Sequence, residues 1–67
     1  MIDITLNGEP RQLAEGTRLS ELIAALGHTP QSLSTAVNGE FVARDARTQR
    51  VLSQGDAVFT FQPITGG

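Results

Sequence analysis

The chain opens with a regular alternation of apolar and polar side chains. The apolar positions of this first stretch are Ile2, Ile4 and Leu6. A period of two is typical of a β-strand that buries one of its faces. The pair Asn7-Gly8 follows, and both residues readily adopt the left-handed conformations of a tight hairpin turn. We therefore predict strands over 1–6 and 10–13, joined as a hairpin.

The next apolar residues recur with the period of a helix. They are Leu19, Leu22, Ile23 and Leu26, spaced at three, one and three residues. This spacing forms a single apolar stripe, with Thr17 as the expected N-cap and Gly27 as the residue that ends the helix. A lone helix in a small domain has to cover its own sheet. We therefore predict that the stripe packs in the core and does not bind a partner.

The second half of the chain predicts short strands between turns. Residues 28–34, with Pro30, show no periodic pattern and are interpreted as a surface connection. A second hairpin is expected over 35–38 and 41–43, with its turn at Gly39-Glu40, and the turn 53–56 precedes a last strand over 57–62. Pro63 cannot donate to a strand ladder, so pairing is expected to stop there.

The predicted order is strand, strand, helix, strand, strand, strand. This order indicates an α+β fold of the β-grasp type, a mixed sheet of four to five strands with one main helix. In that arrangement the first and last strands lie parallel at the centre of the sheet, joined by a crossover that contains the helix. We predict a β-grasp domain over 1–63 and a flexible tail over 64–67 that leaves from the middle of the sheet.

The composition of the chain argues against several classes of function. The chain has 67 residues, no cysteine, one histidine (His28) and a net charge of −2. Thiol chemistry and a histidine or cysteine metal site are therefore not expected. The five basic residues are scattered arginines, which argues against nucleic acid binding. No apolar run is long enough for a membrane span and no signal-peptide pattern begins the chain, so we expect a cytoplasmic protein without a membrane partner.

The remaining candidate for chemistry is the pair Gly66-Gly67. Two residues without side chains can thread a narrow channel in a partner, and no Cβ obstructs attack at the terminal carbonyl. An α-carboxylate has a pKa of about 3.3–3.7, so it is ionised in the cell and can attack the α-phosphorus of ATP held by a partner enzyme. Displacement of the resulting acyl adenylate by sulfur would leave a thiocarboxylate. A glycine-rich end is by itself a weak signal.

Several short motifs resemble a known family. They are Val37-Asn38-Gly39 with Val42 and Arg44 after it, Gly55-Asp56 before the last strand, and Ile64-Thr65-Gly66-Gly67. Together they resemble the ThiS family of sulfur carriers in thiamine biosynthesis, over essentially the whole chain. The resemblance implies a ubiquitin-like fold and a protein co-substrate that is not itself an enzyme.

The resemblance also implies a set of partners and site residues. A ThiF-like enzyme would adenylate Gly67 with ATP and magnesium, which the carrier does not itself bind. A cysteine desulfurase relay would supply the sulfur, and a ThiG-like thiazole synthase would receive it from the thiocarboxylate. Gly67 is then the modified residue, and Gly66, Thr65 and Ile64 thread the channel of the partner.

Three alternatives remain open at this point. The tail also fits MoaD, the molybdopterin sulfur carrier; Pro63 favours MoaD, whereas the chain length and the Val-Asn-Gly turn favour ThiS. The asparagine-glycine and glycine-aspartate turns also occur in TGS domains, which would make the chain a ligand- or RNA-binding regulatory module. Ubiquitin-like tagging of other proteins is the third.

The last strand leaves one question of orientation. Alternation places Phe59 and Phe61 on one face and Val58 on the other. The phenylalanines either fill the core or face outward as anchors for a partner, and the register cannot be fixed from sequence. Arg44, Arg47 and Arg50 are interpreted as a solvated edge.

Overall fold

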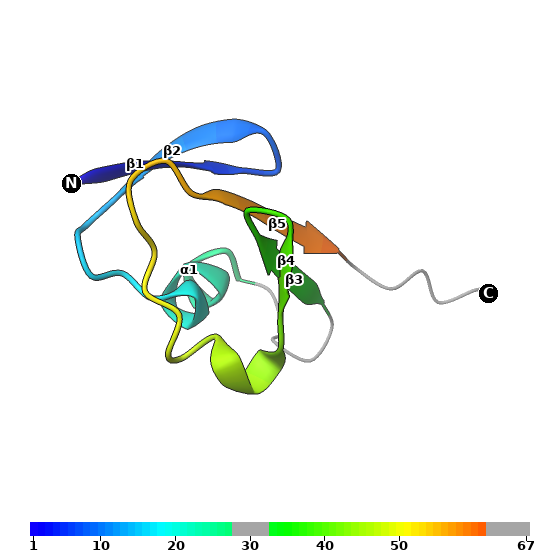
Figure 1. Ribbon diagram of the computed structural model, residues 1–67. Coiled ribbons are helices and arrows are strands. Elements are labelled where there is room, and N and C mark those ends of the chain that lie inside the picture. The colour runs from blue at the N-terminus through cyan, green and yellow to red at the C-terminus, as the bar shows by residue number, and fades with distance from the viewer. Residues whose placement is uncertain (28–32, 62–67) are drawn as a thin grey trace.

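The first and last strands of the chain lie side by side in the computed structural model, which describes residues 1–27 and 33–61. The elements are β1 (Ile2–Leu6), β2 (Glu9–Leu13), α1 (Leu19–Ala25), β3 (Ser34–Val37), β4 (Glu40–Val42), the 3-10 helix η2 (Arg44–Ala46) and β5 (Ala57–Phe61). The sheet has the order β2-β1-β5-β3-β4, and β1 and β5 are parallel at its centre (Figure 1). The predicted α+β β-grasp arrangement is confirmed.

The two hairpins have turns of the same kind. Asn7 and Gly8 have positive φ values of 52° and 86°, and Asn38 and Gly39 have 53° and 82°. Two consecutive left-handed residues form the turn that matches the twist of a hairpin. The first turn is as predicted. The second is Asn38-Gly39, so the predicted Gly39-Glu40 turn is wrong by one residue, because Glu40 already pairs with Val37.

The helix begins one residue later than predicted. Its N-cap is Arg18, and Thr17 instead donates its hydroxyl to the carbonyl of Ala14 at 2.7 Å. The backbone around Arg18 is held extended by a bridge to Val51, in which Leu19 N–H donates to the carbonyl of Arg50 at 2.9 Å. This pairing delays the helical turn. The end of the helix is as predicted, with Gly27 at φ 77°.

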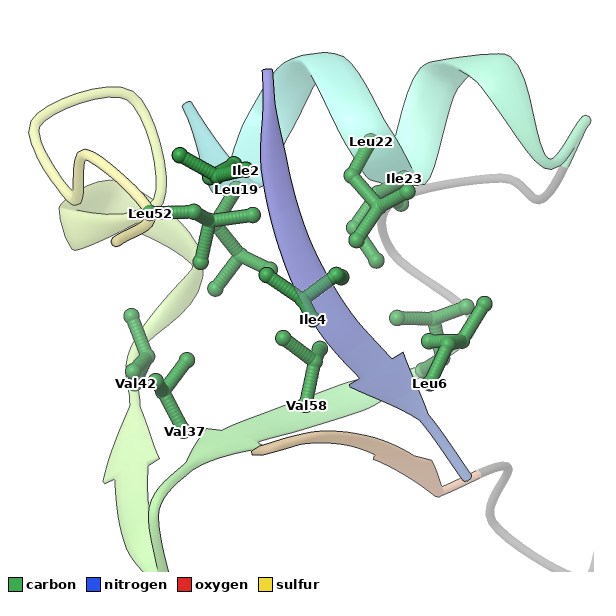
Figure 2. Close-up of a cluster of buried hydrophobic side chains, with 11 residues drawn as sticks. Ile2, Ile4, Leu6, Leu19, Leu22, Ile23, Val37, Val42, Leu52 and Val58 are labelled. Atoms are coloured by element: carbon green, nitrogen blue, oxygen red, sulfur yellow. The ribbon is translucent and has the colours of Figure 1, made fainter. Parts of the chain in front are cut away.

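The core lies between one face of the sheet and α1. Its members come from α1, from every strand except β2, and from the segments before β3 and before β5. They are Ile2, Ile4, Leu6, Leu19, Leu22, Ile23, Leu33, Val37, Val42, Leu52 and Val58. Figure 2 shows the strand side chains gathered toward the helical ones. The predicted role of the helical stripe is confirmed, with Leu26 half-buried at its end. No helix in the described ranges has the length and apolar character to cross a membrane.

The connection before β3 differs from the prediction in its last two residues. Leu33 is buried in the core and Ser34 already begins β3, so the interpretation of 28–34 as a surface connection is wrong for these two positions. An isolated leucine among polar residues has no periodic neighbours, and its burial depends on where the strand starts. Residues 28–32, including His28, lie outside the described residues.

Candidate functional site

β5 presents its two phenylalanines on the open face of the sheet. Val58 is fully buried, whereas Phe59 and Phe61 expose 40% and 55% of their surface. The register follows from the parallel pairing of Leu6 with Val58, which places Val58 on the same face as the core residues of β1. Of the two orientations that the sequence allowed, the outward one is therefore found, and the core alternative is wrong.

A third phenylalanine joins the same face. Ala36 of β3 pairs with Phe59 of β5 on one side and with Phe41 of β4 on the other. Phe41 is 71% exposed. The chain has three phenylalanines and neither tyrosine nor tryptophan, so all of its aromatic side chains lie outside the core. We call Phe41, Ala36, Phe59 and Phe61 the aromatic face.

Sequence reasoning missed Phe41. The strand that contains it has only three residues, and its orientation depends on the turn before it. With Asn38-Gly39 as a two-residue turn, Glu40 pairs with Val37, Phe41 pairs with Ala36, and Val42 pairs with Thr35. Val42 and Thr35 are buried, so Phe41 has to face outward. The exact position of the turn was therefore the signal that could have predicted the outward orientation of Phe41.

The aromatic face is apolar and uncharged. The other outward residues of β3 and β5 are Ser34 and Ala57, neither of which is charged. Large contiguous apolar patches on the surface of a protein mark sites of association. Aromatic side chains are also enriched among the residues that dominate binding energy. The face is therefore the candidate docking surface of this chain.

Two of the motifs quoted from the sequence meet at the start of β5. The side-chain amide of Asn38 donates to Asp56 Oδ1 at 2.9 Å, and its Oδ1 accepts from Ala57 N–H at 3.0 Å. Asp56 Oδ2 accepts from Ser53 N–H at 2.8 Å, and the side chain of Asp56 is buried. The asparagine-glycine and glycine-aspartate turns thus fix the start of the strand that leads to the tail.

Arg47 corrects the prediction of a solvated arginine edge. It is only 3% exposed, with Nε donating to Thr35 Oγ1 at 3.0 Å and Nη2 donating to the carbonyl of Leu33 at 2.6 Å. Burial lowers the pKa of the Arg47 guanidinium from its ordinary value, and the charge of Arg44 lowers it further. Arg44 is exposed, as predicted, and Arg50 is half-buried. Arg47 therefore ties the start of β3 to the segment after β4.

The structure does not describe the predicted tail residues Ile64, Thr65, Gly66 and Gly67. Pro63 also lies outside the described residues, so the predicted domain boundary at this residue stays a prediction. β5 ends at Phe61, and six residues, 62–67, follow it in the sequence. Six residues span at most roughly 20 Å.

Comparison with known proteins identifies the family. The family model described as the ThiS family matches residues 4–67. The chain belongs to the ThiS family. The sulfur carrier protein ThiS of Escherichia coli strain K12 is 30% identical over 66 residues, which cover 98% of this chain and 100% of that protein. The ThiS resemblance is therefore confirmed, and the chain belongs with the sulfur carrier proteins.

Solved structures support the same conclusion. A crystal structure of the thiamine biosynthesis protein ThiS from Geobacter metallireducens matches this ThiS family chain with a TM-score of 0.85 at 30% identity, covering 98% of this chain and 100% of that one. A solution structure of a thiamine biosynthesis protein from the same organism matches with a TM-score of 0.79 at 30% identity, covering 98% of this chain and 88% of that one. The β-grasp fold is therefore that of a solved ThiS protein.

Proposed function

We propose that this ThiS family chain carries sulfur as a thiocarboxylate on Gly67. The carboxylate oxygen of Gly67 attacks the α-phosphorus of ATP, pyrophosphate leaves, and an acyl adenylate forms. A persulfide sulfur of the relay then attacks the acyl carbon and AMP leaves, and a partner thiol reduces the resulting acyl disulfide, which releases the thiocarboxylate and a disulfide. The thiocarboxylate sulfur is the nucleophile delivered to the thiazole precursor.

The chain itself contributes position and not catalysis in this scheme. A ThiF-like enzyme supplies ATP, magnesium and the adenylating groups, a cysteine desulfurase relay supplies sulfur, and a ThiG-like synthase uses it. Ile64, Thr65 and Gly66 lead Gly67 into the channel of each partner. Two glycines suit this task because they leave the backbone without side chains where a channel is narrowest.

One observation of the structure carries the proposal beyond family membership. The central strand β5 carries Phe59 and Phe61 on the exposed aromatic face and is followed directly by the six residues that end at Gly67. Docking through this face and reaction at Gly67 are thereby coupled through one strand. Holding a reactive group at a fixed place in a partner replaces an improbable encounter with an oriented one.

Exchange of pyrophosphate tests the first step. We expect a ThiF-like adenylating enzyme, given ATP and magnesium, to exchange labelled pyrophosphate into ATP only when this chain is present. The reason is that the acyl adenylate and pyrophosphate form reversibly from Gly67 and ATP. An enzyme that exchanges with another ThiS protein but never with this chain would contradict the proposal.

Removal of one ring from the aromatic face is expected to weaken docking to the adenylating enzyme. Phe59→Thr places a β-branched residue, which suits a strand, at this position but removes the ring. We expect the KM for the chain in the exchange assay to rise about 10–30-fold, the range for loss of about 1.4–2 kcal/mol at an anchor residue. The free energy of unfolding, measured with urea, should change by only about 1 kcal/mol, because the ring lies outside the core and is 40% exposed.

Gln12→Thr is the matched control for this substitution. Gln12 of β2 pairs with Asp3 and is exposed, two strands away from β5. We expect its KM to stay within about twofold of the wild-type value, since surface changes away from an interface have small effects. Equal KM values for the two variants would rule out the aromatic face as the docking surface.

A further inference from the structure

The strand that carries the tail loses its partner on one side before it ends. β1 pairs with β5 only at Thr5 with Ala57 and at Leu6 with Val58. After Leu6 the chain turns away at Asn7-Gly8 toward β2. On the other side, β3 accompanies β5 as far as Phe61, which pairs with Ser34. Within the described part of the chain, the last three residues of β5, 59–61, therefore have no strand partner on the side of β1.

Asn7 takes the place of a strand partner on this side. Its backbone N–H donates to the carbonyl of Val58 at 2.8 Å, which is the last regular rung of the parallel ladder. Its Oδ1 accepts from Thr60 N–H at 2.9 Å, and its Nδ2 donates to Thr60 Oγ1 at 3.0 Å. In a continuing parallel ladder, Thr60 N–H would donate to the backbone carbonyl of Asn7. The left-handed conformation of Asn7 redirects that carbonyl into the turn, and the side-chain oxygen takes its place.

We propose that Asn7 is a positioning residue for sulfur carriage, which holds Thr60 and with it the exposed rings of Phe59 and Phe61. Without the two side-chain bonds, β5 from Phe59 onward is held by β3 alone. The end of the strand then opens for part of the time, and a partner binds only the closed fraction. The apparent affinity falls in proportion to that fraction.

The second asparagine-glycine turn supplies a matched control. Asn38 has almost the same φ value and also makes two side-chain hydrogen bonds to the β5 segment, to Ala57 N–H and to Asp56 Oδ1. These bonds lie at the start of the strand, whereas those of Asn7 lie at its end. Asn7→Gly and Asn38→Gly both keep a left-handed turn and both remove two hydrogen bonds. They differ in which end of β5 they release.

The two side-chain hydrogen bonds between Asn7 and Thr60 form a clamp. Hydrogen exchange of the free protein tests this clamp and needs no partner enzyme. We expect Asn7→Gly to lower the protection of the Thr60 amide about tenfold relative to that of the Ala57 amide, the scale for the loss of one or two surface hydrogen bonds. Asn38→Gly should do the reverse. If Thr60 and Ala57 lose protection equally in both variants, Asn7 acts only on global stability and the proposal is overturned.

Kinetics test the functional part, which rests on the proposed function. In the pyrophosphate exchange assay, we expect Asn7→Gly to raise the KM for the chain about three- to tenfold, with kcat within about twofold, because docking closes the strand. Asn38→Gly should raise KM clearly less than Asn7→Gly does, because its bonds lie at the start of β5 and not beside Phe59 and Phe61. A merely structural role predicts the same KM for both variants, and that result would overturn the proposal.

A conservative variant and the wild-type chain complete the test. Asn7→Asp tolerates the left-handed conformation, and its carboxylate accepts from both Thr60 N–H and the Thr60 hydroxyl, so we expect a KM close to the wild-type value. A KM as high as that of Asn7→Gly would argue against the clamp. A wild-type chain without exchange activity would defeat the proposed function instead, while the exchange rates of the free protein would still test Asn7.

Discussion

Deletion of Gly66 and Gly67 is expected to reduce thiocarboxylate formation to the background measured without the chain. The truncated chain ends on Thr65, so its carboxylate no longer reaches the place at which Gly67 would react, and a side chain stands beside it. Two residues without side chains contribute no apolar burial, so the urea midpoint should not change. Formation of thiocarboxylate and urea denaturation, measured on the same preparation, check both parts.

Two further measurements make this prediction specific. The truncated chain should still inhibit the adenylating enzyme, with an inhibition constant within about threefold of the wild-type KM, because the aromatic face is intact. The double variant Gly66→Ala, Gly67→Ala keeps the length and the carboxylate but adds two Cβ atoms. We expect it to react more slowly than the wild type and faster than the truncation. Full activity of the truncated chain would exclude Gly67 as the modified residue.

Arg47→Ala is expected to be the most destabilising of the substitutions discussed. It removes the donors to Thr35 Oγ1 and to the carbonyl of Leu33 and leaves that carbonyl buried without them. Loss of a buried hydrogen-bonded cation of this kind costs about 2–4 kcal/mol. A chain of 67 residues has a total free energy of unfolding of about 3–10 kcal/mol, so this single substitution should remove a large part of it. Urea denaturation followed by circular dichroism measures the loss.

Arg44→Ala is the control for this loss. Arg44 carries the same charge three residues earlier and is exposed. We expect its free energy of unfolding to lie within about 0.5 kcal/mol of the wild-type value. Arg47→Met keeps the apolar stem without the hydrogen bonds and should fall between the two alanine variants. Equal stability of the two alanine variants would show that the contacts of Arg47 contribute nothing.

Local pattern was sufficient for most of the fold. The alternation of Ile2, Ile4 and Leu6 and the helical spacing from Leu19 to Leu26 each bury one face, so the elements and their inward residues could be predicted without a structure. Asn7-Gly8 specified its turn because both positions need left-handed backbone. The central parallel pair of β1 and β5 followed from the order of the elements alone.

Tertiary contacts decided what the pattern could not. Arg47 lies in a polar stretch, and only the approach of Leu33 and Thr35 to its guanidinium makes it a buried residue. The start of the helix depended on pairing with Val51, far along the chain. The face of Phe41 depended on the position of a turn to within one residue, since a shift by one moves every side chain of a strand to the other face.

The candidate site also has parts that local sequence could predict and parts that depend on tertiary contacts. Gly66 and Gly67 were predicted because their chemistry needs only the backbone, and they stay predictions. Alternation placed Phe59 and Phe61 on one face, but only the pairing of β5 with β1 showed that this face is the outward one. The clamp of Asn7 on Thr60 joins residues 53 positions apart and has no signal in either segment. The aromatic face as a whole required the register of β3 between its two neighbours.

The central claim is that Gly67 carries the sulfur, and intact-mass spectrometry of the chain tests it most directly. After incubation with ATP, magnesium, a ThiF-like adenylating enzyme and a sulfur source, the mass should rise by the difference between one sulfur and one oxygen atom. Fragmentation should assign the whole increase to Gly67. An unchanged mass beside an enzyme that converts another ThiS protein, or an increase assigned to any other residue, would contradict the account.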